Sequence, residues 1–359
     1  MALRQALRKV GSALLRRDTK ELNRLLNRAE MRLGRERLLS RPYVYAIGVT
    51  NACNLRCPLC VTGLRQQQKA TRNMDLALFK RIIDRIAPYA ELVQLYKWGE
   101  SLFHPDILEM LRYCKAHGIR TEISSNLNVR KDHVLEGLVI HGLDRLIVSM
   151  DGTDQESYAR YRVGGDLSLL LENVRKLRQF KQRHGRSHPT LILQFLRNKF
   201  TGNQVELLQR QYREWGFDEL LVDDMTTLFK DRDLANARAW FEEEEIHRRG
   251  YMDVPVTMLG RTCTMLYDTM IIEQDGSIPP CCFSTDPQDD FAHWSPSGTL
   301  EELVNAPRFV TARRMFRERH AEPGHPCSAC SVFESHCGIR PTWSGTTGSS
   351  RLRVLNTGA

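Results

Sequence analysis

The sequence has no long hydrophobic run. No stretch of about 18 consecutive apolar residues occurs in its 359 residues, and no apolar signal-peptide core follows the first methionine. Aromatic residues make up only 8% of the chain, whereas hydrophobic and charged residues make up 42% and 26%. These proportions exclude a bundle of membrane-spanning helices and a largely disordered chain. We therefore expect a cytoplasmic protein with one large domain or two.

Disulfides are not expected either. The chain has ten cysteines but no secretion signal, and in a reducing cytosol clustered thiols more often bind metal or take part in chemistry. Nine of the ten lie in two groups, within residues 53–60 and 263–337. The cysteines are therefore predicted to act as ligands in two separate places.

Acidic residues are scarce at the N-terminus. Residues 1–41 hold 12 Lys and Arg against 4 Asp and Glu, which accounts for +8 of the net charge of +9. Leu3, Leu7, Val10 and Leu14 recur at helical spacing, which predicts a basic amphipathic helical arm. Four interpretations compete: a helix packed on the main domain, a helix at a membrane surface, a transit peptide, and a nucleic-acid arm. Because no second basic patch follows, we expect no nucleic-acid partner, while peripheral membrane contact through this arm stays an alternative.

From residue 43 onward the sequence alternates between apolar strand-like runs and helical patterns. The runs that predict strands are 44–49, 92–96, 119–124, 145–150, 191–196 and 219–222. The helical patterns between them are 75–87, 106–117, 131–140, 167–184 and 204–215. This alternation is typical of βαβ units and a parallel sheet. It predicts an α/β fold with a partial (β/α)6 TIM-like barrel over 42–225, and ligand chemistry at the C-terminal ends of the strands.

The remainder of the chain differs in kind. Residues 226–262 are predicted to form a charged helical connector with an acidic run at 242–245. Residues 263–340 are predicted to form a small cysteine-rich domain, with a hairpin turn at Asp275-Gly276 and an amphipathic helix near 300–319. The tail at 341–359 is rich in Gly, Ser and Thr and is predicted to be mobile.

Three thiols follow the first predicted strand within eight residues: Cys53, Cys57 and Cys60. Closely spaced thiolates on a loop suit a soft metal or an iron–sulfur cluster. A closed structural site would need a fourth ligand, and no other Cys or His occurs before His104. The spacing therefore predicts an open site with one coordination position left for a small molecule, as in catalytic metal sites, and a zinc-binding loop is the alternative.

This C-x3-C-x2-C loop resembles the signature of the radical S-adenosylmethionine (SAM) superfamily, which carries it after the first strand of a βα array. The resemblance implies a [4Fe-4S] cluster on the three thiols, with SAM chelating the open iron. Later segments are similar to the family's SAM-binding pattern, although Lys97-Trp98 stands where the family usually has glycine. The SAM-binding residues implied are Gly99, Glu100, Ser124, Ser125, Asn126, Ser149, Asp151 and Arg162, with Arg162 pairing with the SAM carboxylate.

Four thiols of the second group come from two loops that a hairpin would bring together: Cys263, Cys281, Cys327 and Cys330. By themselves they could close a zinc cage. Beside a radical SAM domain, the arrangement resembles the SPASM/twitch extensions, which carry auxiliary [4Fe-4S] clusters. The shorter twitch form is implied, with one auxiliary cluster on these four thiols.

The other cysteines have several interpretations. Cys282 adjoins a proposed ligand, so it could replace that ligand, act as a catalytic hydrogen-atom donor, or be a small buried side chain. Cys337 has the same alternatives, of which the buried side chain is favoured. Cys114 lies in the middle of a helical pattern and is expected in the core.

The resemblance implies a specific chemistry. A low-potential electron donor of flavodoxin or ferredoxin type would reduce the open cluster, which would cleave SAM to a 5′-deoxyadenosyl radical that abstracts hydrogen from the substrate. An auxiliary cluster that accepts an electron from the substrate radical would give a two-electron oxidation. Return of a hydrogen atom by Cys282 would give epimerisation instead. Gln194, Asp223 and Asp224, near strand ends, are candidate substrate contacts.

The substrate class has alternatives at this point. A small molecule of sugar or aminocyclitol type is our main expectation, because the 40 residues before Tyr43 are too short for the leader-binding domain that peptide maturases of this family often carry. A ribosomally made peptide is the alternative. A non-enzymatic zinc or iron–sulfur protein that binds nucleic acid through its basic arm is a third hypothesis, from a different class.

Overall fold

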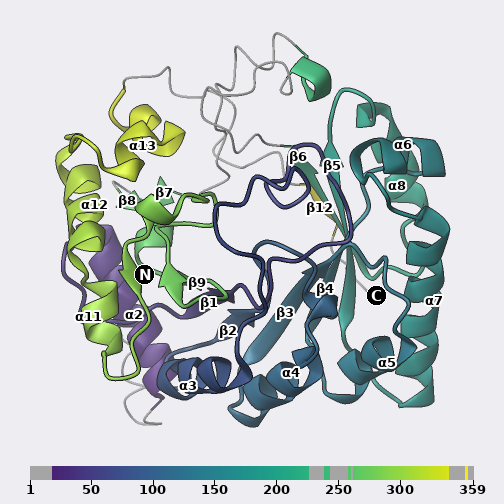
Figure 1. Cartoon of the computed structure of the whole chain (residues 1–359), viewed down its shortest axis with the longest axis horizontal. Coiled ribbons are helices and arrows are strands. Elements are labelled where there is room, and N and C mark those ends of the chain that lie inside the picture. Colours follow the sequence, from purple (N-terminus) through teal and green to yellow (C-terminus); the bar gives the residue numbers. More distant parts are fainter. Residues whose placement is uncertain (1–17, 226–237, 243–257, 260–261, 339–351, 355–359) are drawn as a thin grey trace, which may run out of the picture.

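The fold is that of a computed structural model, which describes residues 18–225, 238–242, 258–259, 262–338 and 352–354. Its centre is a curved sheet with strand order β12-β6-β5-β4-β3-β2-β1-β9 (Figure 1). The first six strands are β1 (Val44–Ile47), β2 (Leu92–Gln94), β3 (Arg120–Ser125), β4 (Arg145–Ser149), β5 (Thr190–Arg197) and β6 (Glu219–Asp224). Each pairs in parallel with the next. The predicted partial α/β barrel is confirmed.

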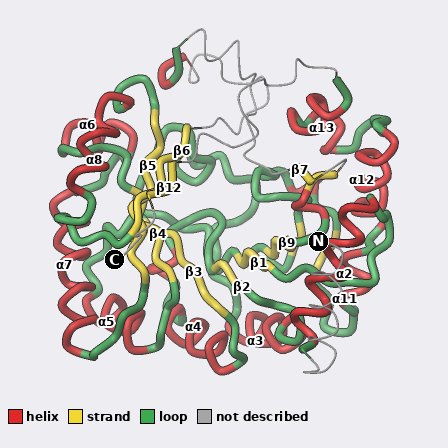
Figure 2. The backbone as a smooth tube through the Cα atoms, turned by 180° about the vertical axis from the view of Figure 1, so that it is seen from behind, coloured by secondary structure: helices red, strands yellow, loops and turns green. Residues whose placement is uncertain are grey.

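Helices cover the outer side of the sheet, as Figures 1 and 2 show from opposite sides. They are α3 (Leu76–Ile86), α4 (Ile107–Ala116), α5 (Asp132–Ile140), α6 (Gln155–Tyr161), α7 (Leu167–Arg183) and α8 (Val205–Gln211). The N-terminal ends of α3 and α7 are capped by Asp75 and Asp166, whose carboxylates accept backbone N–H groups of the first turn. The short helix α6 was not expected, because it contributes little hydrophobic periodicity.

Two further strands extend the sheet at its edges. β9 (Thr269–Ile272) pairs in parallel with β1, so part of the predicted cysteine-rich domain completes the barrel sheet. β12 (Leu352–Val354) pairs antiparallel with β6. β12 lies within the tail that was predicted to be mobile, 341–359, the rest of which lies outside the described residues. A three-residue strand in a Gly/Ser/Thr-rich segment is too short to be recognised by its alternation.

The C-terminal region is built from short elements. Its strands are β7 (Met258–Leu259), β8 (Thr262–Cys263), β10 (Ser277–Ile278) and β11 (Ala292–His293). Its helices are α11 (Leu300–Val304), α12 (Pro307–Glu318) and α13 (Ser331–His336). Five 3-10 turns complete the described elements: Ser101–Phe103, Gly202–Gln204, Thr264–Leu266, Pro287–Asp289 and Pro326–Ala329. The single amphipathic helix predicted near 300–319 is divided at Pro307, since proline favours a helix start and cannot donate a backbone hydrogen bond.

The described part of the N-terminal arm is a helix, α2 (Thr19–Leu33), packed on the main body. Asn27 donates from Nδ2 to the Tyr267 carbonyl oxygen at 2.9 Å, and the buried Glu30 carboxylate accepts from Leu39 and Ser40. These contacts support the packed-helix interpretation for α2. Residues 1–17, including the predicted helix of Leu3, Leu7, Val10 and Leu14, lie outside the described residues, as does most of the 226–262 connector. No described helix has the length and apolarity needed to cross a bilayer.

Candidate active site and metal centres

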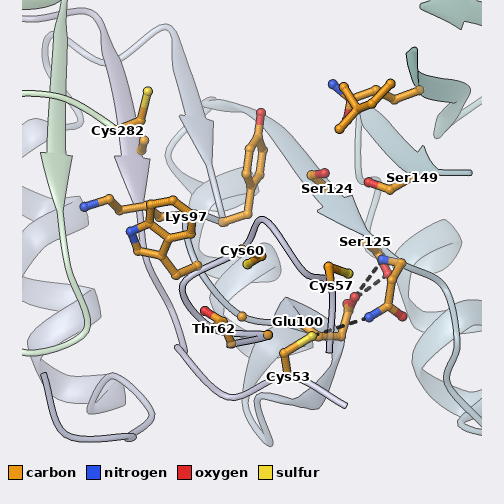
Figure 3. A pocket seen from close by; sticks show the side chains of 18 of the residues that line it. Cys53, Cys57, Cys60, Thr62, Lys97, Glu100, Ser124, Ser125, Ser149 and Cys282 are labelled. Atoms are coloured by element: carbon orange, nitrogen blue, oxygen red, sulfur yellow. Dashed lines mark hydrogen bonds between the residues drawn. The ribbon is translucent and has the colours of Figure 1, made fainter. Parts of the chain in front are cut away.

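A cavity of about 630 Å³ lies inside the curved sheet, toward the C-terminal ends of its strands. The loop after β1 brings Cys53, Cys57 and Cys60 to its wall. Residues from the ends of β2 to β5 line the same space, which is where a parallel barrel places its chemistry. Figure 3 shows the three cysteines near Glu100, Ser124, Ser125 and Ser149. The cavity therefore unites most of the predicted site: Gly99, Glu100, Ser124, Ser125, Asn126, Ser149, Arg162 and Cys282 also line it.

Two glycines let the cysteine loop close tightly. Gly99 has φ +88°, and a Cβ there would lie 2.7 Å from the carbonyl oxygens of Thr50 and Ala52. A Cβ at Gly63 would lie 2.4 Å from the Cys57 carbonyl oxygen. Both approaches are too close for any side chain, so these glycines are required for the path of the loop.

Glu100 connects the cysteine loop to β3. Its backbone N–H donates to the Ala52 carbonyl oxygen at 2.7 Å, while its buried carboxylate accepts from Ser125 Oγ at 2.8 Å and from the Asn126 N–H at 2.7 Å. Asn126 Nδ2 in turn lies 3.7 Å from Cys53 Sγ. Burial raises the pKa of Glu100, against the effect of these donors. The carboxylate thus orients two predicted SAM-binding residues and, through Asn126, the first thiol.

Asp151 does not reach the cavity as predicted. It is fully buried, and its two carboxylate oxygens are taken by Arg162 Nε at 2.5 Å and by the Leu196 N–H at 2.8 Å. Arg162 lines the cavity, and its Nη1 lies 3.8 Å from Cys57 Sγ. Asp151 therefore holds Arg162 in place from behind. Asp151 lies two residues beyond Ser149, the last residue of β4, so the alternation of the strand no longer fixes the direction of its side chain.

The chemistry of the first thiol group fits an iron–sulfur cluster. All three thiols are free, and burial raises the pKa of Cys53 to about 12 and also raises that of Cys57. Thiol ligands lose their protons when a metal binds, which makes cluster binding proton-coupled. Within the described residues, no three Cys, His, Asp or Glu side chains converge so as to hold one metal ion. A four-iron cluster does not require the thiols to converge on one ion, because each thiolate binds its own iron atom.

The four predicted auxiliary thiols also lie together. Cys263, Cys281, Cys327 and Cys330 interact electrostatically with one another, and burial raises the pKa of Cys263, Cys281 and Cys327. For Cys281 the raised pKa is about 11. Cys327 lies in a 3-10 turn that ends at Cys330, with the Cys330 N–H donating to the Cys327 carbonyl oxygen at 3.2 Å. Four thiols from three segments are thus close enough to interact electrostatically, as a closed cluster site requires.

The structure places the other three cysteines in three different environments. Cys282 lines the barrel cavity, although its neighbour Cys281 belongs to the auxiliary group, and Figure 3 shows it across the cavity from Cys53 and Cys57. The Cys337 thiol interacts with Arg319, and no cysteine is among the groups that shift its pKa. Cys114 is fully buried in α4, as expected for a core residue.

Sequence reasoning missed several cavity residues. Gln94 and Tyr96 line the cavity and both contact Glu122 Oε1, at 2.9 and 2.7 Å. Their spacing of two along β2 is the signal that could have placed them on its inner face. Trp98, noted only as a departure from glycine, also lines the cavity, and its buried Nε1 has no hydrogen-bond partner among the described residues. Of the candidate substrate contacts, Gln194 lines the cavity, whereas Asp224 pairs with Arg197 at 2.6 Å.

Two family profiles match the chain. The radical SAM superfamily profile covers residues 47–194, and the profile of SPASM, an iron–sulfur cluster-binding domain, covers residues 263–331. The chain therefore contains a radical SAM domain followed by a SPASM domain. Its cofactors are SAM and [4Fe-4S] clusters, so the zinc interpretations of both thiol groups are set aside. The two matched segments contain all seven cysteines that were predicted as ligands.

Curated relatives of this radical SAM protein have several activities. It is 28% identical over 189 residues to the tungsten-containing aldehyde ferredoxin oxidoreductase cofactor-modifying protein of Pyrococcus furiosus, covering 52% of each chain. It is 29% identical over 131 residues to a PqqA peptide cyclase of Ruegeria pomeroyi, covering 36% of this chain and 34% of that one. The chain spans about half or less of the length of these relatives.

Solved structures share the fold. Streptococcus suis SuiB bound to S-adenosylmethionine matches with a TM-score of 0.61 at 18% identity, covering 88% of this chain and 76% of that one. The enzyme anSMEcpe with bound AdoMet matches with a TM-score of 0.55 at 16% identity, covering 81% and 87%. At these identities the likeness supports the fold, namely a radical SAM barrel with a C-terminal cluster domain.

Proposed function

We propose that this chain is a radical SAM enzyme that abstracts a hydrogen atom from a peptide or protein substrate. The observation that carries the proposal is one cavity whose lining includes the open thiol group, seven of the predicted SAM-binding residues and Cys282. When bound and reduced, the cofactors supply a carbon-centred radical derived from SAM. The chain's own residues bind and orient SAM and the substrate, and exclude water.

We propose a role for each group of residues, supported by its place in the site. Cys53, Cys57 and Cys60 would hold the first cluster, and Cys263, Cys281, Cys327 and Cys330 the auxiliary one. Gly99 and Glu100, the β3 end from Ser124 to Asn126, Ser149 and Arg162 would bind SAM. Asp151 would act only through Arg162, because it is buried behind it. Trp98 adds an unused N–H donor on the cavity wall.

The charges on the cavity wall support a peptide substrate. Lys97 and Arg162 are the cations among the described lining residues, and each is paired with a carboxylate, Glu273 and Asp151 respectively. A phosphorylated or nucleotide substrate would lack a free cationic cradle on this wall. The rest is neutral polar or apolar, including Gln194, Leu196, Met225 and Phe283. Such a lining suits the side chain of an amino acid.

The relatives also favour a peptide substrate. The sequence by itself favours a small sugar-like molecule. Relatives named PqqA peptide cyclases support the peptide alternative, as do fold neighbours whose structures contain the precursor peptide SuiA or the Kp18Cys peptide. A relative from Chlorobaculum tepidum, 35% identical over 113 residues, is a GTP 3′,8-cyclase, so a small molecule is the second candidate.

Two outcomes are open to the substrate radical. The auxiliary cluster, held by its four cysteines, would supply an acceptor for one electron, and loss of a proton from the substrate would then complete a two-electron oxidation. Transfer of the Cys282 S–H hydrogen to the radical would complete an epimerisation and leave a thiyl radical, which one electron from the external donor and one proton from solvent would return to the thiol. Product formed in deuterium oxide distinguishes the two, since only the thiol route introduces solvent deuterium at carbon.

The external electron donor has a candidate docking surface. A second cavity of about 360 Å³ lies against the cysteine loop, and Cys53 lines both cavities. Arg56 and Arg65, on the wall of this second cavity, are exposed and have no ion-pair partner among the described residues. We propose that an acidic one-electron carrier of flavodoxin or ferredoxin type docks there, where charge complementarity would speed its encounter with the cluster.

A substrate experiment tests the proposal. The reduced protein is incubated with SAM and an extract of cells grown on deuterated medium, and 5′-deoxyadenosine is analysed for deuterium. We expect transferred deuterium with the intact extract and none after the extract is digested by an immobilised protease. Transfer that survives digestion would support the small-molecule candidate. Absence of 5′-deoxyadenosine in every sample, with both clusters present, would contradict the enzyme itself.

A further inference from the structure

Lys97 is a buried cation at the boundary between the barrel and the C-terminal region. It follows β2 at a position where the family pattern usually has glycine, and its side chain is 3% exposed. Its ammonium group pairs with Glu273, which is 5% exposed and follows β9. Burying a charge costs free energy unless its partners compensate for the lost hydration. The contacts of this ion pair therefore indicate which segments it fixes in place.

The Glu273 carboxylate is shared by two lysines. Its other oxygen lies 2.6 Å from Nζ of Lys69, in the segment that follows the first three thiols. Lys69 also contacts Asp290 Oδ2 at 2.9 Å and Ser277 Oγ at 2.5 Å. The network Lys97–Glu273–Lys69–Asp290 thus joins the segment after the first thiol group, the end of β2, and the turns on both sides of β10.

Lys97 makes one more contact, to the turn that carries two of the key cysteines. Its Nζ donates to the Ser284 carbonyl oxygen at 3.1 Å, and the Ser284 N–H donates to the Cys281 carbonyl oxygen at 3.3 Å. The ammonium group also interacts electrostatically with the Cys281 and Cys282 thiols. Figure 3 shows Lys97 and Cys282 on the same side of the cavity.

We infer that Lys97 is a positioning residue for the auxiliary cluster: it holds the Cys281–Ser284 turn in place and its positive charge favours the reduced form of that cluster. The inference rests on the proposed ligand set, which includes Cys281. Net charge and hydrogen bonding near the sulfurs set cluster potentials, so a cation beside one ligand raises the potential. A cluster that accepts electrons from a substrate radical benefits from this shift.

Two variants remove the opposite charges of the Lys97–Glu273 ion pair, one each. Lys97→Met removes the positive charge and leaves Glu273 with Lys69 alone, so the auxiliary potential should become more negative. We expect a change of about tenfold in the one-electron reduction constant, which corresponds to 59 mV. Glu273→Gln removes the negative charge but keeps hydrogen-bonding atoms, so it should shift the potential in the opposite direction. Lys80→Met, which breaks an ion pair with Glu109 between outer helices, should leave the potential unchanged.

The measurement is a redox titration of the holoprotein followed by electron paramagnetic resonance, with iron content determined for every variant. Opposite shifts for Lys97→Met and Glu273→Gln would support the inference. Shifts in the same direction, or no shift in either variant, would overturn it. If Lys97→Met fails to retain its auxiliary cluster, Glu273→Gln decides: a positive shift supports the inference, and any other result overturns it. Failure of the proposed function is distinguishable, because the unmodified protein would then lack two clusters or SAM cleavage.

Discussion

The two thiol groups of this protein differ in almost every physical respect. The first three thiols lie within eight residues on one loop and line an open cavity. The four auxiliary thiols come from three segments spread over residues 263–330 and interact electrostatically with one another. A short loop that exposes three ligands leaves an iron free to bind SAM, whereas four converging ligands complete the coordination of a cluster. Openness to a ligand is therefore decided by how the chain supplies its thiols, and the number of cysteines alone does not decide it.

Removal of one thiol from the open group should have the largest effect. We expect Cys57→Ala to lose the first cluster, so that iron falls from about eight to about four per chain. Production of 5′-deoxyadenosine should fall to background, because no other site can bind SAM at an iron. Iron analysis and chromatography of the reaction with dithionite and SAM check this. The control is Cys114→Ala, in the buried core of α4, which should retain all its iron.

Removal of one thiol from the closed group should separate the two regions. In Cys327→Ala we expect about four irons to remain and SAM cleavage to continue, while conversion of the substrate stops. The same iron and product analyses, with substrate added, measure this. If SAM cleavage is lost together with the auxiliary cluster, the two thiol groups do not act independently. That result would contradict the distinction between an open, SAM-binding group and a closed, auxiliary group.

Reduction by the protein electron donor should depend on charges on the outer face of the cysteine loop and not on charges elsewhere on the surface. The double variant Arg56→Glu/Arg65→Glu should react roughly tenfold more slowly with a reduced flavodoxin or ferredoxin at low salt, because it repels an acidic partner. With dithionite its rate should equal that of the unmodified protein. A double variant of equal charge change on α2 and α8, Arg32→Glu/Arg210→Glu, is the control. Equal slowing in both double variants would exclude docking at Arg56 and Arg65.

Asp268 reports on the junction between the two regions. Its carbonyl oxygen accepts from the N–H groups of Tyr43 and Val44 at 3.0 Å, and burial raises the pKa of its partly buried carboxyl to about 6. Between pH 4 and 7 the folded state therefore binds more protons than the unfolded state, so stability falls as pH rises through the folded pKa. Relative to Asp268→Asn, the unmodified protein should lose about 2 kcal/mol over this range. Urea unfolding at several pH values measures the difference, and parallel curves for the two proteins would contradict it.

Cys337 should show the smallest effect. Its thiol is influenced by Arg319 and not by the other cysteines, so Cys337→Ser should keep about eight irons and change stability by less than about 0.5 kcal/mol. Iron analysis and thermal unfolding test this. Loss of about four irons would instead place Cys337 among the ligands of the auxiliary cluster.

The barrel was predictable because its signals are local. Apolar runs and helical periodicity located β1 to β6 and five of the six helices around them, and the thiol spacing located both groups. Contacts between distant segments could not be predicted. Residues Thr269–Ile272 pair with β1, and Leu352–Val354 with β6, through hydrogen bonds that leave no periodic pattern in so few residues.

Within the site, the sequence did not show in which direction each side chain points, so some cavity residues could not be predicted. Asp151 has the chemistry of a cavity residue, but its partners Arg162 and Leu196 turn it inward. Lys97 and Trp98 were interpreted only as departures from glycine, because the carboxylate that pairs with Lys97 lies 176 residues away in the sequence. Such roles depend on tertiary partners, which motif spacing does not specify.

The central claim is that only the first thiol group binds SAM. The most direct test uses electron paramagnetic resonance of two reduced variants, each of which retains one cluster, before and after SAM is added. In Cys327→Ala, which keeps the open group, SAM should change the cluster spectrum and 5′-deoxyadenosine should form. In Cys57→Ala, which keeps the closed group, the spectrum should stay the same. A SAM-induced change in Cys57→Ala, or none in Cys327→Ala, would contradict the account.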